Sequence, residues 1–206
     1  MEIRLGALRK KDHKQAIQFA RQGMHFDWYT DSPLLLRLYG RYFWCLEYGR
    51  ATQAIAAYRG DALAGVLLAE MRGEAKPWRS LAKRLYIRLF ELSQGLLFRG
   101  GTDAYAQANQ EMFARYCQTH TPDGEITFLA VDPRLEGRGI GTLLLNELAR
   151  RESGKQLYLY TDSGCTYQFY ERRGFARAGE KDIVMELGGK RVNLKCLLYS
   201  KALENR

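Results

Sequence analysis

A glycine-rich turn in the second half of the chain has the residues of an anion-binding site. It follows the apolar run 126–131 and reads Asp132-Pro133-Arg134-Leu135-Glu136-Gly137-Arg138-Gly139-Ile140-Gly141-Thr142. Three of the five residues 137–141 lack a side chain, so the backbone can approach a bulky anion, and free N–H groups at the start of the following helix point toward negative charge. The turn therefore predicts a pyrophosphate site. Its glycine spacing differs from the GxGxxG of dinucleotide-binding βαβ units.

A carboxylate that precedes this turn could take part in proton transfer. Glu125 begins the apolar run, and a carboxylate that is partly desolvated there would have a raised pKa and could accept a proton. The alternative interpretation is an exposed acid at the start of a strand, and Glu70 is a second candidate for the same role.

The remaining pattern predicts the elements that must position these groups. Apolar alternation predicts seven strands, over residues 2–7, 52–58, 63–70, 125–131, 156–161, 183–187 and 192–199. Helical spacing predicts helices over residues 12–26, 34–48, 78–97, 103–117, 140–151 and 163–174, the second of them started by Ser32 and Pro33. The order predicts one α/β domain over residues 1–206, with a mixed sheet and a helical insertion at about 72–123 between the third and fourth strands.

Together these motifs resemble the GCN5-related N-acetyltransferase (GNAT) superfamily. The window 136–141 is similar to the family signature of Arg or Gln, two residues, Gly, one residue, then Gly or Ala, and residues 170–175 are similar to its tyrosine, three residues, Gly-Phe. The resemblance implies the GNAT fold, acetyl-CoA as cosubstrate and no metal. It also implies direct transfer of the acetyl group, within a ternary complex, to a primary amine of a small molecule or a protein.

The resemblance also implies roles for individual residues. Glu125 would be the general base. Tyr170 would face the sulfur of coenzyme A and act as the acid, and the alternative is a helix tyrosine that packs against Phe169. The Leu129 N–H would stabilise the oxyanion. The predicted cofactor-binding residues are Leu129, Ala130, Val131, Gly137, Arg138, Gly139, Ile140, Gly141, Thr142, Ser163 and Tyr170.

Two departures from the family pattern support an alternative function. Glu136 replaces the usual Arg or Gln, and a carboxylate beside a pyrophosphate weakens binding unless Arg134 and Arg138 offset it. Ser163 replaces an asparagine that is common in the family. The alternative is a degenerate acyl-CoA-binding sensor or regulatory module.

Composition sets the remaining expectations. The 206 residues carry a formal charge of +9, which attracts anions and would suit acidic acceptors. Leu81, Leu85, Leu89 and Leu92 recur at helical spacing and predict a half-buried helix with a solvated basic face, so neither nucleic acid nor membrane is expected as a partner. The four cysteines and three histidines show no metal spacing, no signal peptide is recognisable, and a cytoplasmic protein is expected. A homodimer is compatible with the sequence.

Overall fold

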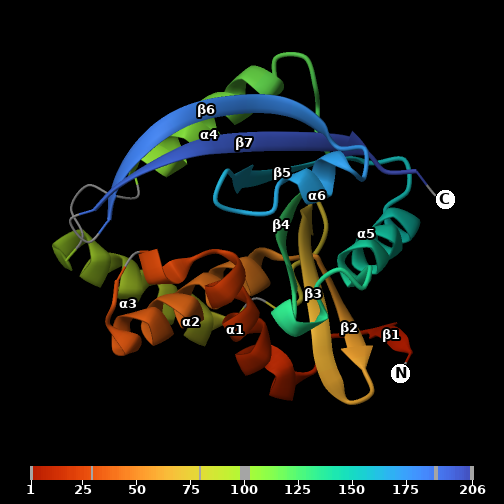
Figure 1. The fold of residues 1–206 in the computed structure, drawn as a ribbon, viewed down its shortest axis with the longest axis horizontal. Helices are drawn as coiled ribbons and strands as arrows, with labels where there is room; N and C mark the ends of the chain where they lie inside the picture. Colours follow the sequence, from red (N-terminus) through yellow and green to blue (C-terminus); the bar gives the residue numbers. More distant parts are fainter. Residues whose placement is uncertain (1, 29, 79, 98–102, 188–189, 205–206) are drawn as a thin grey trace.

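One mixed sheet organises the molecule, and a computed structural model describes it at residues 2–28, 30–78, 80–97, 103–187 and 190–204. Within these residues seven strands lie in the order β1-β2-β3-β4-β5-β7-β6 (Figure 1). Neighbouring strands are antiparallel except β4 and β5. The predicted α/β class with about seven strands is confirmed. The strands are β1 Ile3–Gly6, β2 Gln53–Arg59, β3 Ala62–Met71, β4 Gly124–Val131, β5 Gln156–Asp162, β6 Ala176–Leu187 and β7 Lys190–Ala202.

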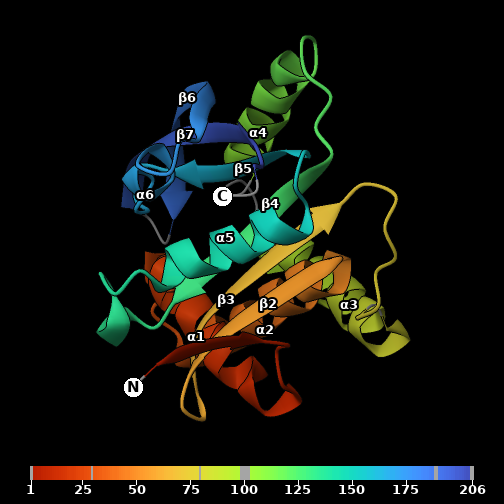
Figure 2. The same ribbon diagram turned by 90° about the vertical axis from the view of Figure 1, so that its right-hand side faces the viewer.

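Helices cover both faces of this sheet. They are α1 His13–Gly23, α2 Pro33–Arg50, α3 Leu81–Leu97, α4 Asp103–Tyr116, α5 Ile140–Arg151 and α6 Gln168–Glu171, with short 3-10 turns at Lys10–Asp12, Phe26–Trp28 and Pro133–Leu135. Helix α5 packs its buried leucines on one face (Figure 2). On the opposite face, α1 and α2 cover the β1–β4 half and α4 covers β6 and β7. Along the chain, the two helices α3 and α4 follow β3 and precede β4.

Local signals explain most of the element boundaries. Pro33 occupies the first turn of α2, and the Ser32 hydroxyl accepts the Leu35 N–H at 3.5 Å. Helix α6 is shorter than predicted because the Asp162 carboxylate accepts the Gly164 N–H at 2.8 Å, a local turn that competes with a helix. Strand β6 begins earlier than predicted, since its polar first half is held by pairing with β7. The predicted turn at 188–189 and the connection at 99–102 lie outside the described residues.

Strands β4 and β5 separate soon after they begin to pair. They pair only at Gly124 with Leu157 and at Glu125 with Tyr158. At this point β4 contains one extra residue, Thr127, because Ala69 of β3 pairs with Ile126 while Leu68 pairs with Phe128. Such a bulge bends a strand and reverses the facing of the residues beyond it. From Ile126 onward, β4 therefore has β3 on one side and an open edge on the other.

The prediction for α3 was wrong about which face is buried. Leu81 is 81% exposed, and Leu85, Leu89 and Leu92 are exposed with it. The packed face carries Tyr86 and Phe90 instead: the Tyr86 hydroxyl donates to the Leu38 carbonyl of α2 at 3.0 Å, and Phe90 stacks on Tyr42 at 4.5 Å. Two helical stripes, one of leucines and one of aromatic residues, compete on this helix, and the aromatic stripe contacts α2.

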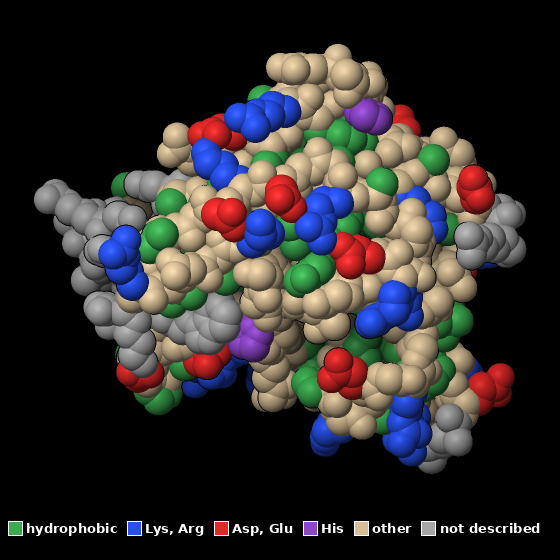
Figure 3. Space-filling model, turned by 45° about the horizontal axis from the view of Figure 1, so that its top comes forward, with side chains coloured by type: hydrophobic (Ala, Val, Ile, Leu, Met, Phe, Trp, Pro, Cys, Tyr) green, Lys and Arg blue, Asp and Glu red, His purple; other side chains and the backbone are tan. Residues whose placement is uncertain are grey.

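On the face that Figure 3 shows, Lys and Arg side chains lie among Asp and Glu side chains and do not gather into one basic patch. Ion pairs such as Arg177 with Glu180, at 2.9 Å, account for part of this mixing. Of the helices that the structure describes, none is long and apolar enough to cross a bilayer.

Candidate active site

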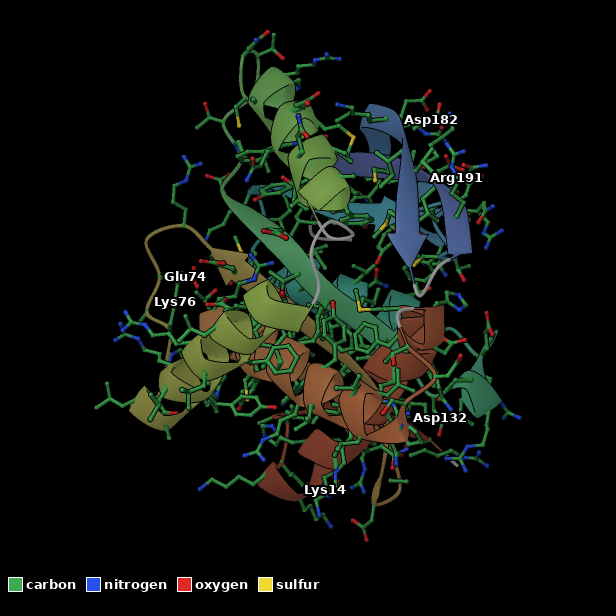
Figure 4. The ribbon with its side chains drawn as sticks, turned by 90° about the vertical axis from the view of Figure 1, so that its left-hand side faces the viewer. Lys14, Glu74, Lys76, Asp132, Asp182 and Arg191 are labelled. Carbon is green, nitrogen blue, oxygen red and sulfur yellow. The ribbon has the colours of Figure 1, made fainter. Side chains whose placement is uncertain are left out.

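A cavity of about 1060 Å³ opens where β4 and β5 separate. Its walls come from β4, from the turn before α5, and from the segment that joins β5 to α6. Helices α2 and α4 close the opposite end, and Figure 4 looks toward this end, with α4 above α2 and β4 between them. Leu129, Ala130 and Val131 lie along the open edge of β4 and line the cavity. An extended ligand could therefore add to this edge as a strand would.

The glycine-rich turn forms one end of the cavity and fits a polyphosphate. Gly137 and Gly139 have φ angles of 78° and 74°, in the left-handed region that favours glycine, and an added Cβ at either would meet nothing within 4 Å. A Cβ on Gly141 would lie 2.9 Å from the Phe169 ring, so the third glycine is needed for close packing. Helix α5 begins at Ile140 without a side-chain cap, which leaves N–H groups of its first turn for an anion.

Two arginines that the sequence analysis did not single out lie beside this turn. Arg172 and Arg173 both line the cavity. The Arg173 Nε donates to the Thr142 hydroxyl at 2.8 Å, and its guanidinium stacks on the Phe169 ring at 3.8 Å. Burial and the charge of Arg172 lower the pKa of Arg173. The Arg173 guanidinium is thus a second group that attracts anions, beside the N–H groups at the start of α5.

Tyr170 lies in the same cavity, as predicted for the acid. Its ring packs edge-on against Phe169 and Phe175, with centroid distances of 5.1 and 5.6 Å. Among the described residues its hydroxyl has no hydrogen-bond partner. Burial raises the pKa of Tyr170, so the hydroxyl keeps its proton at neutral pH.

Three predicted residues lie outside the cavity lining. Arg138 is exposed to solvent. The Thr142 hydroxyl accepts a hydrogen bond from the Arg173 guanidinium. The Ser163 hydroxyl accepts the Lys195 N–H at 3.0 Å and faces a separate surface hollow. Arg134 is tied to Asp132 at 2.7 Å, so it is not available to offset Glu136, which stands at the cavity mouth.

Glu125 also lies outside the lining, in an ion-pair cluster. Both of its oxygens accept from the Arg50 guanidinium, at 2.9 and 3.1 Å, and one accepts from the Tyr158 hydroxyl at 3.2 Å. Arg50 also contacts Glu70 at 3.4 Å, and Lys76 pairs with Glu70. Both predicted base candidates are thus engaged with cations.

A different carboxylate, Glu47 of α2, reaches the cavity. It is 7% exposed and accepts from Arg50 at 2.9 Å. Burial raises the pKa of Glu47, and the charge and hydrogen bond of Arg50 and a hydrogen bond from Thr127 offset part of this rise. Glu47 follows Gly40 and Trp44 on the buried face of α2. A carboxylate on an otherwise apolar helix face was the signal in the sequence that could have identified it.

Side chains that could hold a metal do not cluster anywhere in the described ranges.

The comparisons with known proteins that find a match find acetyltransferases. Residues 102–177 match the model of the acetyltransferase (GNAT) domain. No curated protein sequence matches the chain.

Solved structures resemble the whole chain. A Corynebacterium glutamicum protein described as histone acetyltransferase HPA2 and related acetyltransferase has a TM-score of 0.62 and 16% identity, over 98% of this chain and 97% of that chain. An N-acetyltransferase from Staphylococcus aureus has a TM-score of 0.55 and 14% identity, over 99% and 100%. The PaiA N-acetyltransferase of Thermoplasma acidophilum, solved in complex with coenzyme A, has a TM-score of 0.53 and 14% identity, over 98% and 99%. At these identities the likeness establishes the fold.

Proposed function

We propose that this protein, a member of the GNAT acetyltransferase superfamily, is an acetyl-CoA-dependent N-acetyltransferase that acts on a primary amine in a ternary complex. The predicted resemblance to this superfamily is confirmed. One observation carries the proposal: the open edge of β4, the glycine turn before α5 and Tyr170 all line a single cavity. Transfer through a ternary complex requires both substrates to meet in one cavity. Beyond the β4 edge this cavity continues to residues of α2 and α4, where the amine acceptor would bind.

The first task of the site is to hold coenzyme A. We assign its pyrophosphate to the N–H groups of residues 137–142, where Arg173 adds positive charge. The pantetheine arm would pair with Leu129, Ala130 and Val131 along the open edge of β4. When bound, acetyl-CoA supplies the activated acyl group. Ser163 keeps a role at this site only if its loop rearranges, since its hydroxyl is held by β7.

The second task is to stabilise charge on the reacting thioester. The Leu129 N–H is the proposed donor to the carbonyl oxygen, on which negative charge develops as the amine attacks. Tyr170, kept protonated by burial, donates a hydrogen bond to the sulfur as it leaves. Both groups lie in the stretch of the cavity that β4 and α6 line.

The third task is to remove a proton from the acceptor. An alkylamine with a pKa of about 10.4 is mostly protonated at pH 7, so its proton must be transferred before or during attack. The sequence analysis proposed Glu125 for this role. The geometry favours Glu47, since it lines the cavity and its proton affinity is raised by burial, whereas Glu125 holds Arg50 in place. Glu125 then acts as a positioning residue for the Arg50–Glu47 pair.

A second function, an acyl-CoA-binding sensor without turnover, has one observation in its favour. Glu136 lies at the cavity mouth, where its negative charge opposes a pyrophosphate. Tyr170 and the buried Glu47 favour the enzyme, because a sensor needs neither an acid nor a base in the cavity. We place either activity in the cytoplasm, in keeping with four cysteines that are all free thiols.

Calorimetric titration with acetyl-CoA, followed by a thiol-release assay across a panel of amines, tests these alternatives. Binding followed by thiol release in the presence of an amine establishes the transferase. Binding without release across the panel supports the sensor. No binding refutes both, and Glu136→Gln then shows whether the carboxylate at the mouth is the cause.

A further inference from the structure

We infer that the amine acceptor carries a second positive charge, held by Asp162 and Asn109 between α4 and β5. The chemical class is an aliphatic diamine. This inference rests on the proposed transferase activity and adds to it the class of acceptor. It differs from the expectation drawn from the net charge of +9, which would suit acidic acceptors.

The charges in the cavity lining are distributed unevenly along its length, although the exposed Glu136 belongs to the glycine turn at the arginine end. The two arginines of the lining, Arg172 and Arg173, come from the α6 end, beside the glycine turn. At the α2 and α4 end the described lining contains the carboxylates Glu47 and Asp162 and neither lysine nor arginine. One end therefore attracts the phosphates of coenzyme A, and the other attracts a cation and repels an anion.

Asp162 carries a charge that no cation of the described chain neutralises. One of its oxygens accepts the Gly164 N–H at 2.8 Å, and the other accepts the Tyr105 hydroxyl of α4 at 3.2 Å. Burial and then the charge of Asp162 raise the pKa of Tyr105, so this hydroxyl stays protonated and donates a hydrogen bond without adding a positive charge. Glu47 differs, because Arg50 is its partner. The unpaired charge lies on the α4 side, away from the proposed base.

Asn109 supplies an acceptor atom that lacks a partner. It lies one helical turn after Tyr105 on α4 and lines the cavity, and its Oδ1 is buried with no hydrogen bond to any described residue. Buried acceptors in proteins almost always have a donor, because leaving one unpaired is unfavourable. An ammonium, with three N–H donors and no acceptor, would satisfy Asn109 and Asp162 together.

Aromatic rings also line the cavity that contains the carboxylates of Glu47 and Asp162. Tyr39, Tyr42 and Phe43 come from α2, Tyr105 from α4 and Tyr160 from β5. Their faces attract a cation, and their apolar bodies suit methylene groups. An α,ω-diamine meets both requirements: one nitrogen loses its proton to Glu47 and attacks the acyl carbon, while the other remains an ammonium at Asp162.

Three acceptors of equal length test the inference at saturating acetyl-CoA: 1,5-diaminopentane, pentylamine and 5-aminopentanoate. The thiol-release assay should give a kcat/KM for the diamine roughly tenfold to a hundredfold above pentylamine, the range expected for a hydrogen bond to a charged group, with the amino acid lowest. Equal values for the diamine and pentylamine, or a preference for the amino acid, would overturn the inference while leaving the transferase intact.

Variants locate the second charge. Asp162→Asn keeps a group for the Tyr105 hydroxyl and removes the charge, so the ratio of the kcat/KM values for diamine and pentylamine should fall roughly tenfold. Asn109→Ala should lower the same ratio, and Gln110→Ala, an exposed neighbour on α4, should not. A ratio that survives both substitutions assigns the preference elsewhere and refutes this site.

Failure of the transferase proposal is distinguished by binding. If no amine releases thiol although acetyl-CoA binds, calorimetry on the protein loaded with coenzyme A still compares 1,5-diaminopentane with pentylamine. Tighter binding of the diamine, lost in Asp162→Asn, supports the cation site without turnover. Equal binding refutes it.

Discussion

Replacing Glu47 by Gln tests the proposed base with little change in shape. Glu47 is buried, and its carboxylate is one of three that contact Arg50. In the variant Arg50 keeps Glu125 at 2.9 and 3.1 Å and Glu70 at 3.4 Å, so its charge stays paired. We therefore expect a folded protein with a stability loss of about 1 to 3 kcal/mol, the usual cost of one altered buried hydrogen bond. Affinity for coenzyme A should be unchanged.

The catalytic loss should be much larger than the structural one. A positioned base contributes about 10²- to 10⁴-fold, which corresponds to about 3 to 5 kcal/mol of barrier. The pH dependence identifies the group. Because Glu47 must be ionised to take the proton from a bound ammonium, log kcat/KM should have a slope of about 1 below the raised pKa of Glu47 and level off above it. Glu47→Gln should depend on the neutral amine instead, so its slope of about 1 should continue toward the amine pKa of about 10.4.

The assay is thiol release between about pH 5 and 9, with Glu125→Gln as the matched variant, since it makes the same chemical change on the other side of Arg50. We expect Glu125→Gln to lose less than roughly tenfold, through a displaced Arg50. The reasoning is refuted if Glu47→Gln retains activity within roughly threefold while Glu125→Gln loses a hundredfold or more, and the base would then be the strand glutamate that the resemblance implied.

Substitutions at three further positions test the proposed cofactor half of the cavity. Tyr170→Phe should lower kcat roughly tenfold to a hundredfold and leave the Kd for coenzyme A unchanged by calorimetry, and unchanged turnover would remove the tyrosine from the mechanism. Gly139→Glu should abolish binding, whereas Gly139→Ala, at a φ of 74°, should cost about 1 to 2 kcal/mol of stability and keep measurable binding; intact affinity in the glutamate variant would contradict the pyrophosphate assignment. Arg173→Met should weaken coenzyme A binding roughly tenfold and flatten its salt dependence, and an unchanged Kd would show that Arg173 only braces Thr142.

The glycine turn, to which we assign the cofactor phosphates, could be placed from the sequence because its signals are local. Glycines must stand where the backbone has a positive φ or meets another group closely, and both conditions hold here, at Gly139 and at Gly141. Helix α5 has the predicted bounds, Ile140–Arg151, because Gly139 begins it and Gly154, at a φ of 84°, follows its end. Tyr170 was proposed differently, from the resemblance of residues 170–175 to the family's tyrosine, three residues, Gly-Phe pattern.

The acceptor half could not be predicted because its residues come from separate elements. Glu47, Asn109 and Asp162 lie on α2, α4 and β5, and each is one polar residue in an otherwise ordinary segment. Their common cavity follows from the topology, which places α2 and α4 on the same face of the sheet on either side of the separated strands. The ion pair of Glu125 with Arg50 could not be predicted for a related reason: from the sequence alone, nothing indicates that Arg50 reaches it.

A single irregularity, the bulge at Thr127, connects the two halves of the site. It ends the pairing of β4 with β5 after two residue pairs, which opens the strand edge proposed for pantetheine. It also turns Phe128 toward α2, while Ile126 packs on the α5 side, and it brings the Thr127 hydroxyl to Glu47. Glu125 lies before the bulge, where β4 is still paired with β5, and therefore outside the opening. The separation of the strands thus explains why a carboxylate from α2, instead of one from β4, faces the reacting amine in the proposed mechanism.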